Sequence, residues 1–404
     1  MSLALKGDSP FYPGHPVPVE YFVGREREVK RMTRALSQVG SGKPRAVFVS
    51  GSYGIGKSSL AKLIGTLGER NHGLVYLHVL LGTARHTEDI GEKLVEALVN
   101  KPSLEPGLMK KVREGLGQYI AKVSVLGVTI DFARLRADSP TITRGALRLL
   151  DGVVSRGRDD DARGIVLVLD EINGLAAQPA FAHFLKELVD GNALRDQPLP
   201  LLLIVCGTEE RYSEIVACHE PVARIFQIAQ LDALSAEESR MFFRSAFVRV
   251  GLALDPDAEQ MLVEYSGGLP KVMHILGDKA FWLAADSQVD QEVAWQTVLE
   301  AAEDIGRQFV APLYRQLRSE RYRSILPRLG QEWVSGSFRR SDVQALLTEA
   351  ELKVFDNLLR KLRELKLIRP GPERGEYEFT DRLTPIYLVM QGAREERRSR
   401  GGHG

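Results

Sequence analysis

The stretch GSYGIGKS, residues 51–58, matches the pattern G-x-x-x-x-G-K-S/T at each of its fixed positions. It follows RAVFVSG (45–51), a short run rich in β-branched residues that is typical of a buried strand. It precedes SLAKLIGTL (59–67), where the apolar spacing predicts a helix. A strand, a glycine-rich turn and a helix in this order predict a loop that binds phosphate.

The residue types of this loop suit the phosphates of a nucleotide. Glycines allow backbone N–H groups to turn inward, and the N-terminal end of the following helix adds positive potential. Lys57 can reach the β- and γ-phosphates, and the Ser58 hydroxyl can ligate magnesium. The residues predicted to hold ATP here are Gly51, Ser52, Tyr53, Gly54, Ile55, Gly56, Lys57, Ser58 and Ser59.

A second polar site follows the apolar run GIVLVLD (164–170), which predicts another buried strand. Asp170 and Glu171 stand at its carboxyl end, where α/β sheets bind their ligands. Acidic residues are also common at ordinary solvated strand ends. Downstream of a phosphate loop, the pair predicts a site in which Asp170 holds the magnesium coordination shell and Glu171 orients the attacking water.

Apolar strands and helices alternate over the first half of the chain. Besides the two strands above, the runs 74–81 and 199–208 predict strands, and helices are predicted at 26–39, 88–99 and near 180–190. This alternation predicts the α/β fold of a P-loop NTPase, a parallel sheet with helices on both faces. Strict alternation at 122–135 predicts a β-ribbon inserted into the same domain.

The rest of the chain predicts further modules. The pattern is helical from Ser235 to about Leu317, which predicts a helical lid. Three helical stretches and two short strands around a Pro/Gly turn then have the plan of a winged helix-turn-helix. The predicted domains are an extended N-terminal arm (1–20), an α/β nucleotide-binding domain (21–233), a lid (234–318), a winged helix (319–392) and a disordered basic tail (393–404).

The composition narrows the class of protein. A chain of 404 residues that is 44% hydrophobic and 26% charged is typical of a globular protein with two or three domains. Two cysteines, Cys206 and Cys218, give neither a disulfide framework nor a metal cluster. The N-terminus lacks the apolar stretch of a signal peptide, and no apolar run has the length of a membrane span. A cytoplasmic location without membrane contact is therefore expected.

The phosphate loop and the acidic strand end together resemble the AAA+ superfamily of ATPases over residues 20–300. Within it, the chain is similar to the archaeal origin-initiator ATPases, the AAA+ regulators of DNA transposition and the STAND signalling ATPases. This resemblance implies hydrolysis of ATP with Mg²⁺. The segment YFVGRE (21–26) is similar to the one that opens such domains and lines the adenine pocket, which implies that Phe22 and Val23 contact the base.

The same resemblance implies roles for three more residues. Thr208, at the end of the strand 199–208, matches the sensor-1 position, which responds to the γ-phosphate. Arg224 is a candidate arginine finger acting across a subunit interface, with an ordinary surface arginine as the alternative. Lys271 follows the turn GGLP (267–270) and matches the sensor-2 position, where many relatives carry arginine. A lysine offers a point charge there but not a planar fork.

Basic charge gathers at the C-terminal end of the chain. The net charge of the whole chain is +1, whereas residues 321–404 contain 17 Lys and Arg against 12 Asp and Glu. Basic side chains on a winged helix predict contacts with duplex DNA, and a protein-interaction surface is the alternative. The residues predicted to contact DNA are Arg339, Arg340, Arg360, Lys361, Arg363 and Arg374.

Two functions fit these observations. In the first, a homo-oligomeric AAA+ ATPase assembles on DNA with ATP to load, recruit or remodel a partner or client. In the second, a STAND-like signalling switch, for example in phage defence, uses its winged helix to bind a protein effector. An inactive ATPase with a structural role is disfavoured because Lys57, Asp170 and Glu171 are all present.

Overall fold

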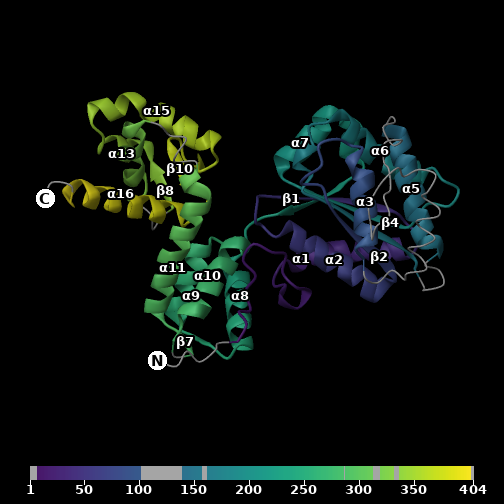
Figure 1. Ribbon diagram of the computed structural model, residues 1–404, viewed down its shortest axis with the longest axis horizontal. Helices are drawn as coiled ribbons and strands as arrows, with labels where there is room; N and C mark the ends of the chain where they lie inside the picture. The colour runs from purple at the N-terminus through teal and green to yellow at the C-terminus, as the bar shows by residue number, and fades with distance from the viewer. Residues whose placement is uncertain are drawn as a thin grey trace, which may run out of the picture. The chain divides into compact units, whose positions relative to one another are not determined.

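The structure is a computed structural model that describes residues 7–101, 139–156, 162–285, 287–312, 319–331 and 336–401 (Figure 1). The chain divides into two compact units. The sheet unit is Pro16–Asp232, and the helical unit is Ala233–Gly404 together with Met1–His15. The predicted β-ribbon at 122–135 lies outside the described residues.

A parallel sheet of five strands forms the centre of the sheet unit, in the order β2-β3-β4-β1-β5. The strands are β1 (Arg45–Gly51), β2 (Leu74–Leu80), β3 (Gly164–Asp170), β4 (Leu201–Gly207) and β5 (Gln227–Leu231). All residues of β3 and β4 are buried, as expected of unbroken apolar runs inside a parallel sheet. The α/β fold predicted from the sequence is confirmed. Sequence patterns did not predict β5, whose short sequence QIAQL at the sheet edge contains two glutamines and has neither an unbroken apolar run nor a strict alternation.

Helices cover both faces of this sheet (Figure 1). One face carries α1 (Glu26–Gly40) and α2 (Lys57–His72), and the other carries α3 (Asp89–Val99), α5 (Ser139–Arg156), α6 (Pro179–Ala193) and α7 (Glu209–Cys218). Successive side chains of a strand point to opposite faces. On β2, Leu77 and Val79 therefore join the core beneath α3, α5, α6 and α7, whereas Tyr76 and His78 point to the α2 side.

The lid part of the helical unit begins with strong helix-start signals. Ser235 and Glu238 form a capping box at the start of α8, and Asp255 and Asp290 cap α9 and α11 with their carboxylates. Two short parallel strands pair between these helices, which corrects the expectation of an all-helical lid. The elements are α8 (Ala236–Arg249), β6 (Ala253–Leu254), α9 (Pro256–Ser266), α10 (Pro270–Leu283), β7 (Gln288–Val289) and α11 (Gln291–Ile305).

The N-terminal segment is anchored to the lid by an aromatic side chain. Phe11 is only 4% exposed, and its ring centroid lies 5.1 Å from that of Phe247 and 5.8 Å from that of Phe242. Gly277 of α10 makes room for it, because a Cβ there would lie 2.1 Å from the Phe11 ring. The next residue, Tyr12, donates its backbone N–H to Nδ1 of His274 at 3.2 Å. The sequence predicted an extended arm, and the structure adds this docking site.

The C-terminal module contains three helices and a three-stranded antiparallel sheet in the order β8-β10-β9. Its longest helix, residues 349–364, buries an apolar face through Phe355, Leu358, Leu359 and Leu362. The elements of the module are α13 (Glu320–Leu329), β8 (Ser337–Arg339), α14 (Arg340–Gln344), α15 (Glu349–Glu364), β9 (Ile368–Pro370) and β10 (Glu376–Phe379).

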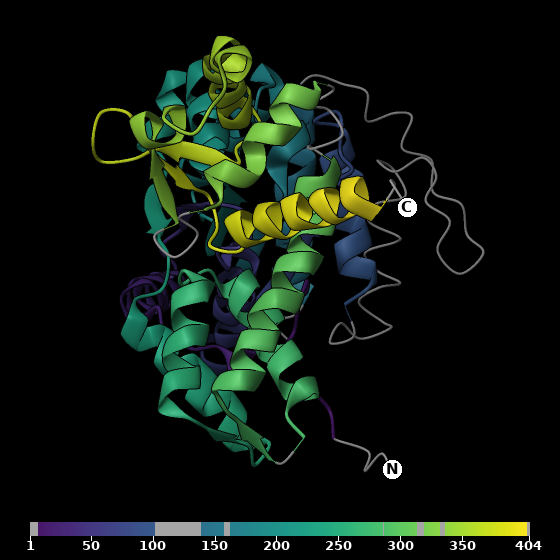
Figure 2. The same cartoon turned by 90° about the vertical axis from the view of Figure 1, so that its left-hand side faces the viewer.

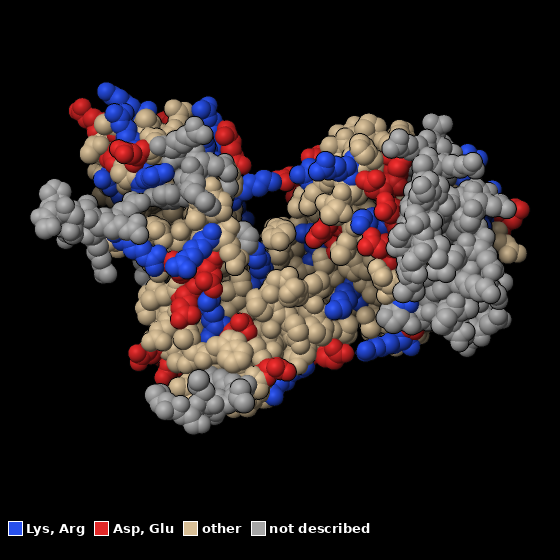
Figure 3. Space-filling view, viewed as in Figure 1, with Lys and Arg blue, Asp and Glu red and all other residues tan. Residues whose placement is uncertain are grey.

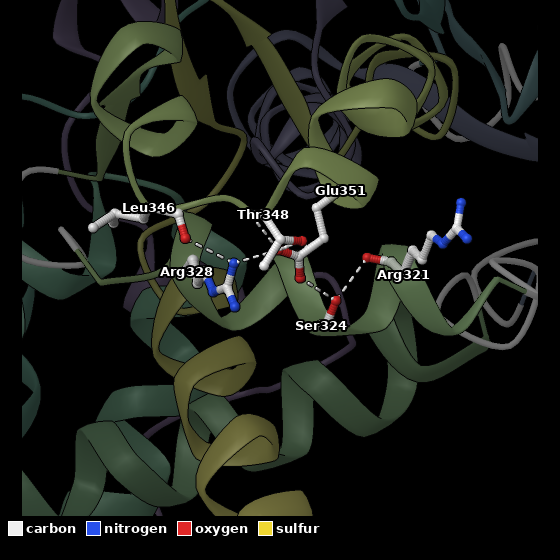
Figure 4. A network of polar contacts seen from close by, with 6 residues as sticks. All are labelled: Arg321, Ser324, Arg328, Leu346, Thr348 and Glu351. Atoms are coloured by element: carbon white, nitrogen blue, oxygen red, sulfur yellow. Dashed lines mark hydrogen bonds and ion pairs between the residues drawn. The ribbon is translucent and has the colours of Figure 1, made fainter.

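A buried carboxylate joins α13 to the start of α15 (Figure 4). Glu351 accepts hydrogen bonds from the Ser324 hydroxyl at 2.6 Å, the Thr348 backbone N–H at 2.8 Å and the Arg328 guanidinium at 2.7 Å. Arg328 also donates to the Leu346 carbonyl at 2.9 Å. Burial raises the pKa of Glu351, but these hydrogen bonds outweigh it and lower the pKa to about 2.

The final helix, α16 (Thr384–Gly401), packs on both α13 and α11 (Figure 2). Tyr387 of α16 fills the space above Gly306, where a Cβ would lie 2.1 Å from the ring. The tail predicted to be disordered from residue 393 instead continues α16 as far as Gly401. Among the helices of the described ranges, none combines the length and the apolar character that crossing a membrane requires.

Candidate nucleotide site

The loop between β1 and α2 has the geometry of an anion-binding turn. Gly54 has a φ of 78° and Gly56 a φ of 98°, conformations that a residue with a Cβ rarely adopts. Lys57 begins α2, and its Nζ donates to the Gly51 carbonyl at 2.9 Å and to the Ser52 carbonyl at 2.8 Å. The loop thus curls around an ammonium group at the N-terminus of a helix, where anions are favoured.

Two residues that sequence patterns did not single out support this loop. Arg25 is buried with a φ of 62°, and its Nη2 donates to the Ile55 carbonyl at 3.0 Å. Val17 donates its backbone N–H to the Ser59 hydroxyl at 3.3 Å. The segment before α1 therefore contacts the phosphate loop directly. Arg25 belongs to the segment YFVGRE, but nothing in its spacing from the loop indicated this contact.

Asp170 lies at the carboxyl end of β3, beside the start of α2, and is 3% exposed. Its Oδ1 accepts the backbone N–H of Glu171 at 2.9 Å, and its Oδ2 lies 3.1 Å from Nε2 of His78. Burial raises the pKa of Asp170, but hydrogen bonds from His78 and Ser58 outweigh it and lower the pKa below its usual value. Asp170 is therefore a carboxylate at neutral pH.

The electrostatic balance of the site also involves Lys57. Burial lowers the pKa of Lys57, whereas the nearby Asp170 carboxylate raises it. The attraction between this ammonium and this carboxylate offsets part of the cost of burial.

Glu171 turns away from the strand with a φ of 57°, which is uncommon for a residue with a side chain. Its carboxylate lies over Gly82, where a Cβ would stand 2.2 Å from Oε2 of Glu171. Gly82 follows β2, the strand next to β3. Because Gly82 has no side chain, the Glu171 carboxylate can occupy this position at the carboxyl edge of the sheet.

The oxygen atoms at this edge of the sheet suit the coordination of a magnesium ion. Magnesium prefers oxygen ligands and binds through one or two protein groups together with phosphate oxygens. The Ser58 hydroxyl lies close enough to the Asp170 carboxylate to lower its pKa, so both oxygens lie near the start of α2. Ser58 and Asp170 would hold a magnesium ion there, and the ion would supply positive charge that stabilises nucleotide phosphates.

The remaining predicted residues of the sheet unit lie in varied settings. Tyr53 is 79% exposed at the loop tip, and Phe22 and Val23 are half-buried after the 3-10 helix Val19–Tyr21. Thr208 follows β4 and caps α7, its hydroxyl accepting the Arg211 N–H at 3.4 Å. Arg224 is exposed at the end of the short helix Glu220–Arg224.

Lys271 belongs to the helical unit, in the first turn of α10. Burial lowers its pKa, and Asp381 of the C-terminal module raises it. The preceding turn depends on glycine, because a Cβ on Gly268 would lie 2.1 Å from the Leu234 carbonyl oxygen. The role of Lys271 as a sensor stays a prediction.

The geometry of the loop and the acidic strand end agrees with a comparison to known families. The model of the AAA ATPase domain matches residues 21–204, from the segment before α1 into β4. The chain contains an AAA ATPase domain. The AAA+ ATPase domain predicted from the sequence is confirmed, whereas the branch within this superfamily and the winged helix stay predictions. Among curated proteins, none matches the chain.

Several solved structures share the fold of this chain. The ORC2 protein of Aeropyrum pernix, in its ADPNP–ADP complexes, aligns with a TM-score of 0.59 and 15% identity over 98% of each chain. A Walker-type ATPase of Pyrococcus abyssi aligns with a TM-score of 0.56 and 18% identity over 91% of this chain and 96% of its own. Cdc6p from Pyrobaculum aerophilum aligns with a TM-score of 0.50 and 12% identity over 96% of this chain and 98% of its own. At such identities the likeness concerns the fold.

Proposed function

We propose that this AAA ATPase binds ATP with magnesium, assembles into a homo-oligomer on duplex DNA, and uses hydrolysis to load, recruit or remodel a partner there. The observation that carries the nucleotide part is the juxtaposition of Lys57, Ser58 and Asp170 at the carboxyl edge of the sheet. Glu171, placed over Gly82, would orient the attacking water. Exposed Arg224 would act on the nucleotide of a neighbouring subunit.

The DNA part of the proposal rests on exposed basic side chains of α15. Arg360 donates a hydrogen bond to the Asn357 side chain at 3.1 Å, and Arg363 is exposed one turn further on. Within the described residues, neither forms an ion pair with a carboxylate, and the same holds for Lys361 and Arg374. These four cations are available to neutralise phosphates.

Other basic residues of the module are already paired. Arg339 lies 2.6 Å from Glu373, Arg340 2.9 Å from Asp356 and Arg369 2.7 Å from Glu378. On the face drawn in Figure 3, blue and red side chains of this module accordingly lie side by side. Phosphates would have to compete with these carboxylates, so Arg339 and Arg340 should contribute less to DNA binding than α15 does.

A direct experiment measures particle mass on a duplex DNA fragment with ATP, with ADP and without nucleotide. Glu171→Gln should bind ATP but hydrolyse it slowly, so the assembled complex should accumulate on DNA. The double variant Arg360→Glu/Arg363→Glu should weaken DNA binding and flatten its salt dependence, with the slope reduced by about one per lost phosphate contact. Arg240→Glu, a single charge reversal on α8 of the lid, should leave the salt slope unchanged. No DNA binding at low salt in any nucleotide state would refute the proposal.

A STAND-like switch remains the second candidate, and one contact favours it. The glycine turn before α10 touches the C-terminal module, because a Cβ on Gly267 would lie 3.5 Å from Cγ of Arg382. A change in the lid could therefore reach the module through this turn. This function predicts tightly bound ADP after purification, slow turnover and no response to DNA, which separates it from the first candidate.

A further inference from the structure

A chain of hydrogen bonds leads from α2 to the carboxylate of Asp170. His78 lies on β2, the strand that pairs in parallel with the strand of Asp170, β3. It stands opposite Val168, two residues before Asp170. Its Nε2 lies 3.1 Å from Oδ2 of Asp170, and its Nδ1 lies 2.7 Å from the Tyr76 hydroxyl. With Tyr76 as the donor to Nδ1, the neutral imidazole carries its proton on Nε2 and donates it to Asp170.

Tyr76, at one end of this series of hydrogen bonds, packs against α2, the helix that follows the phosphate loop. A Cβ on Gly65 of α2 would lie 2.3 Å from the Tyr76 ring, so the ring rests on the bare helix backbone. The Tyr76 backbone N–H donates to the Glu69 carboxylate at 3.3 Å, and Lys101 pairs with Glu69 and lies over the ring, 5.7 Å from its centroid. The position of Tyr76 is therefore set by α2, the helix that begins with Lys57 and Ser58.

Both carboxylate oxygens of Asp170 are then held by neighbours. In this tautomer Oδ2 accepts a hydrogen bond from Nε2 of His78, and Oδ1 accepts one from the Glu171 backbone N–H at 2.9 Å. A carboxylate with two fixed donors cannot rotate freely, which keeps it facing Ser58. Partners of this kind set the orientation of metal-binding groups, and their removal commonly weakens metal binding.

We propose that His78 and Tyr76 are positioning residues, which hold the Asp170 carboxylate toward Ser58 and thereby set the affinity of the nucleotide site for magnesium. This inference rests on the proposed magnesium-dependent binding of ATP and adds two residues to it. His78 touches neither nucleotide nor reacting atoms in this account. Its effect on the reaction passes entirely through Asp170.

The test measures binding of a fluorescent ATP analogue to the full chain, first with EDTA and then across a magnesium titration. His78→Leu removes the donor and should raise the magnesium concentration at half-saturation about tenfold or more. Nucleotide affinity in EDTA should remain at the wild-type value. His78→Gln can still donate at the Nε2 position and should restore the wild-type magnesium requirement to within about threefold.

Two further variants complete the test. Tyr76→Phe keeps the ring on Gly65 but removes the hydroxyl. It should raise the magnesium concentration at half-saturation by a smaller factor of about three to five, which corresponds to the free energy of one neutral hydrogen bond. His86→Leu makes the same change at an exposed histidine and should have no effect. If His78→Leu does not fold, Tyr76→Phe and His78→Gln carry the test.

Two results would overturn the inference. One is a wild-type magnesium requirement in both His78→Leu and Tyr76→Phe. The other is a loss of nucleotide affinity that is equal with and without magnesium, which indicates damage to packing. A wild-type protein whose ATP binding ignores magnesium would instead refute the proposed function, and the inference with it.

Discussion

The guanidinium of Arg25 donates a hydrogen bond to the carbonyl oxygen of Ile55 across 3.0 Å, which joins the residues before α1 to the phosphate loop. Both residues are buried, and they are 30 positions apart in the chain. A buried carbonyl that loses its donor costs roughly 1–3 kcal/mol. The loop conformation, and with it the nucleotide site, therefore depends on a residue outside the G-x-x-x-x-G-K-S/T pattern.

The first prediction concerns this contact. Arg25→Met keeps the length of the side chain but removes the donor, so ATP should bind about tenfold more weakly, in line with the loss of one charged hydrogen bond. Arg27→Met, an exposed residue of α1, is the matched control and should bind ATP like the wild type. Equilibrium titration with labelled ATP measures both. An Arg25→Met variant with wild-type affinity would show that the contact is not needed.

Gly82 should separate hydrolysis from binding. An alanine there would place a Cβ 2.2 Å from the Glu171 carboxylate and displace it. We expect Gly82→Ala to lower the ATPase turnover about tenfold or more, because loss of a water-orienting group acts on the chemical step. ATP affinity should change little. Gly191→Ala, where nothing lies within 4 Å of the new Cβ, is the control for the substitution itself. Unchanged turnover in Gly82→Ala would argue against a catalytic Glu171.

Glu351 should stabilise the helical unit in a pH-dependent way. Its pKa of about 2 in the folded protein lies below the ordinary 4.5, so the carboxylate contributes stability above pH 4.5 and loses it as the pH falls toward 2. Glu351→Gln should reduce the free energy of unfolding by roughly 2 kcal/mol at pH 7, and the difference from wild type should shrink below pH 4.5. Urea unfolding across this pH range measures it.

The control for Glu351 is Glu349→Gln, which removes an exposed acid from the same first turn of α15. It should cost only about 0.3–1 kcal/mol, the effect of a charge at a helix N-terminus. Equal losses in the two variants would mean that the network with Ser324 and Arg328 adds nothing.

The docked N-terminal segment gives a further prediction. Phe11→Ala should destabilise the helical unit by about 3 kcal/mol, as expected when a buried aromatic ring is truncated. The segment around residue 11 should then become sensitive to limited proteolysis. His15→Ala alters an exposed side chain and should leave both properties unchanged. A Phe11→Ala variant that resists protease like the wild type would contradict the anchoring role.

Local patterns in the sequence predicted the parts of the molecule that depend on local physics. Short apolar runs predicted β1, β2, β3 and β4, and the glycine spacing predicted the phosphate loop. The sequence predicted that the helical lid begins at Ser235, and in the structure Ser235 caps α8, the first helix of the lid. The edge strand β5 was not predicted because two of its five residues are exposed glutamines and its apolar run is short.

Contacts between distant segments could not be read from periodicity. Phe11 lies in a proline-rich stretch with no repeat, and its partners Phe242 and Phe247 are more than two hundred positions away. His78 and Asp170 are 92 positions apart and meet only because β2 and β3 are neighbours in register. Once the strand order is known, the register places His78 on the same face as Asp170, so this pair becomes predictable at that stage.

The most direct test of the account is equilibrium binding of ATP to Lys57→Ala in the presence of magnesium. Lys57 is the one side-chain cation enclosed by the phosphate loop in the described residues, so its loss should weaken ATP binding at least about a hundredfold, the scale of a buried charge contact. Lys62→Ala, one turn further along α2, should bind like the wild type. If Lys57→Ala binds ATP as tightly as the wild type does, the loop does not hold the phosphates and the assignment of the site is wrong.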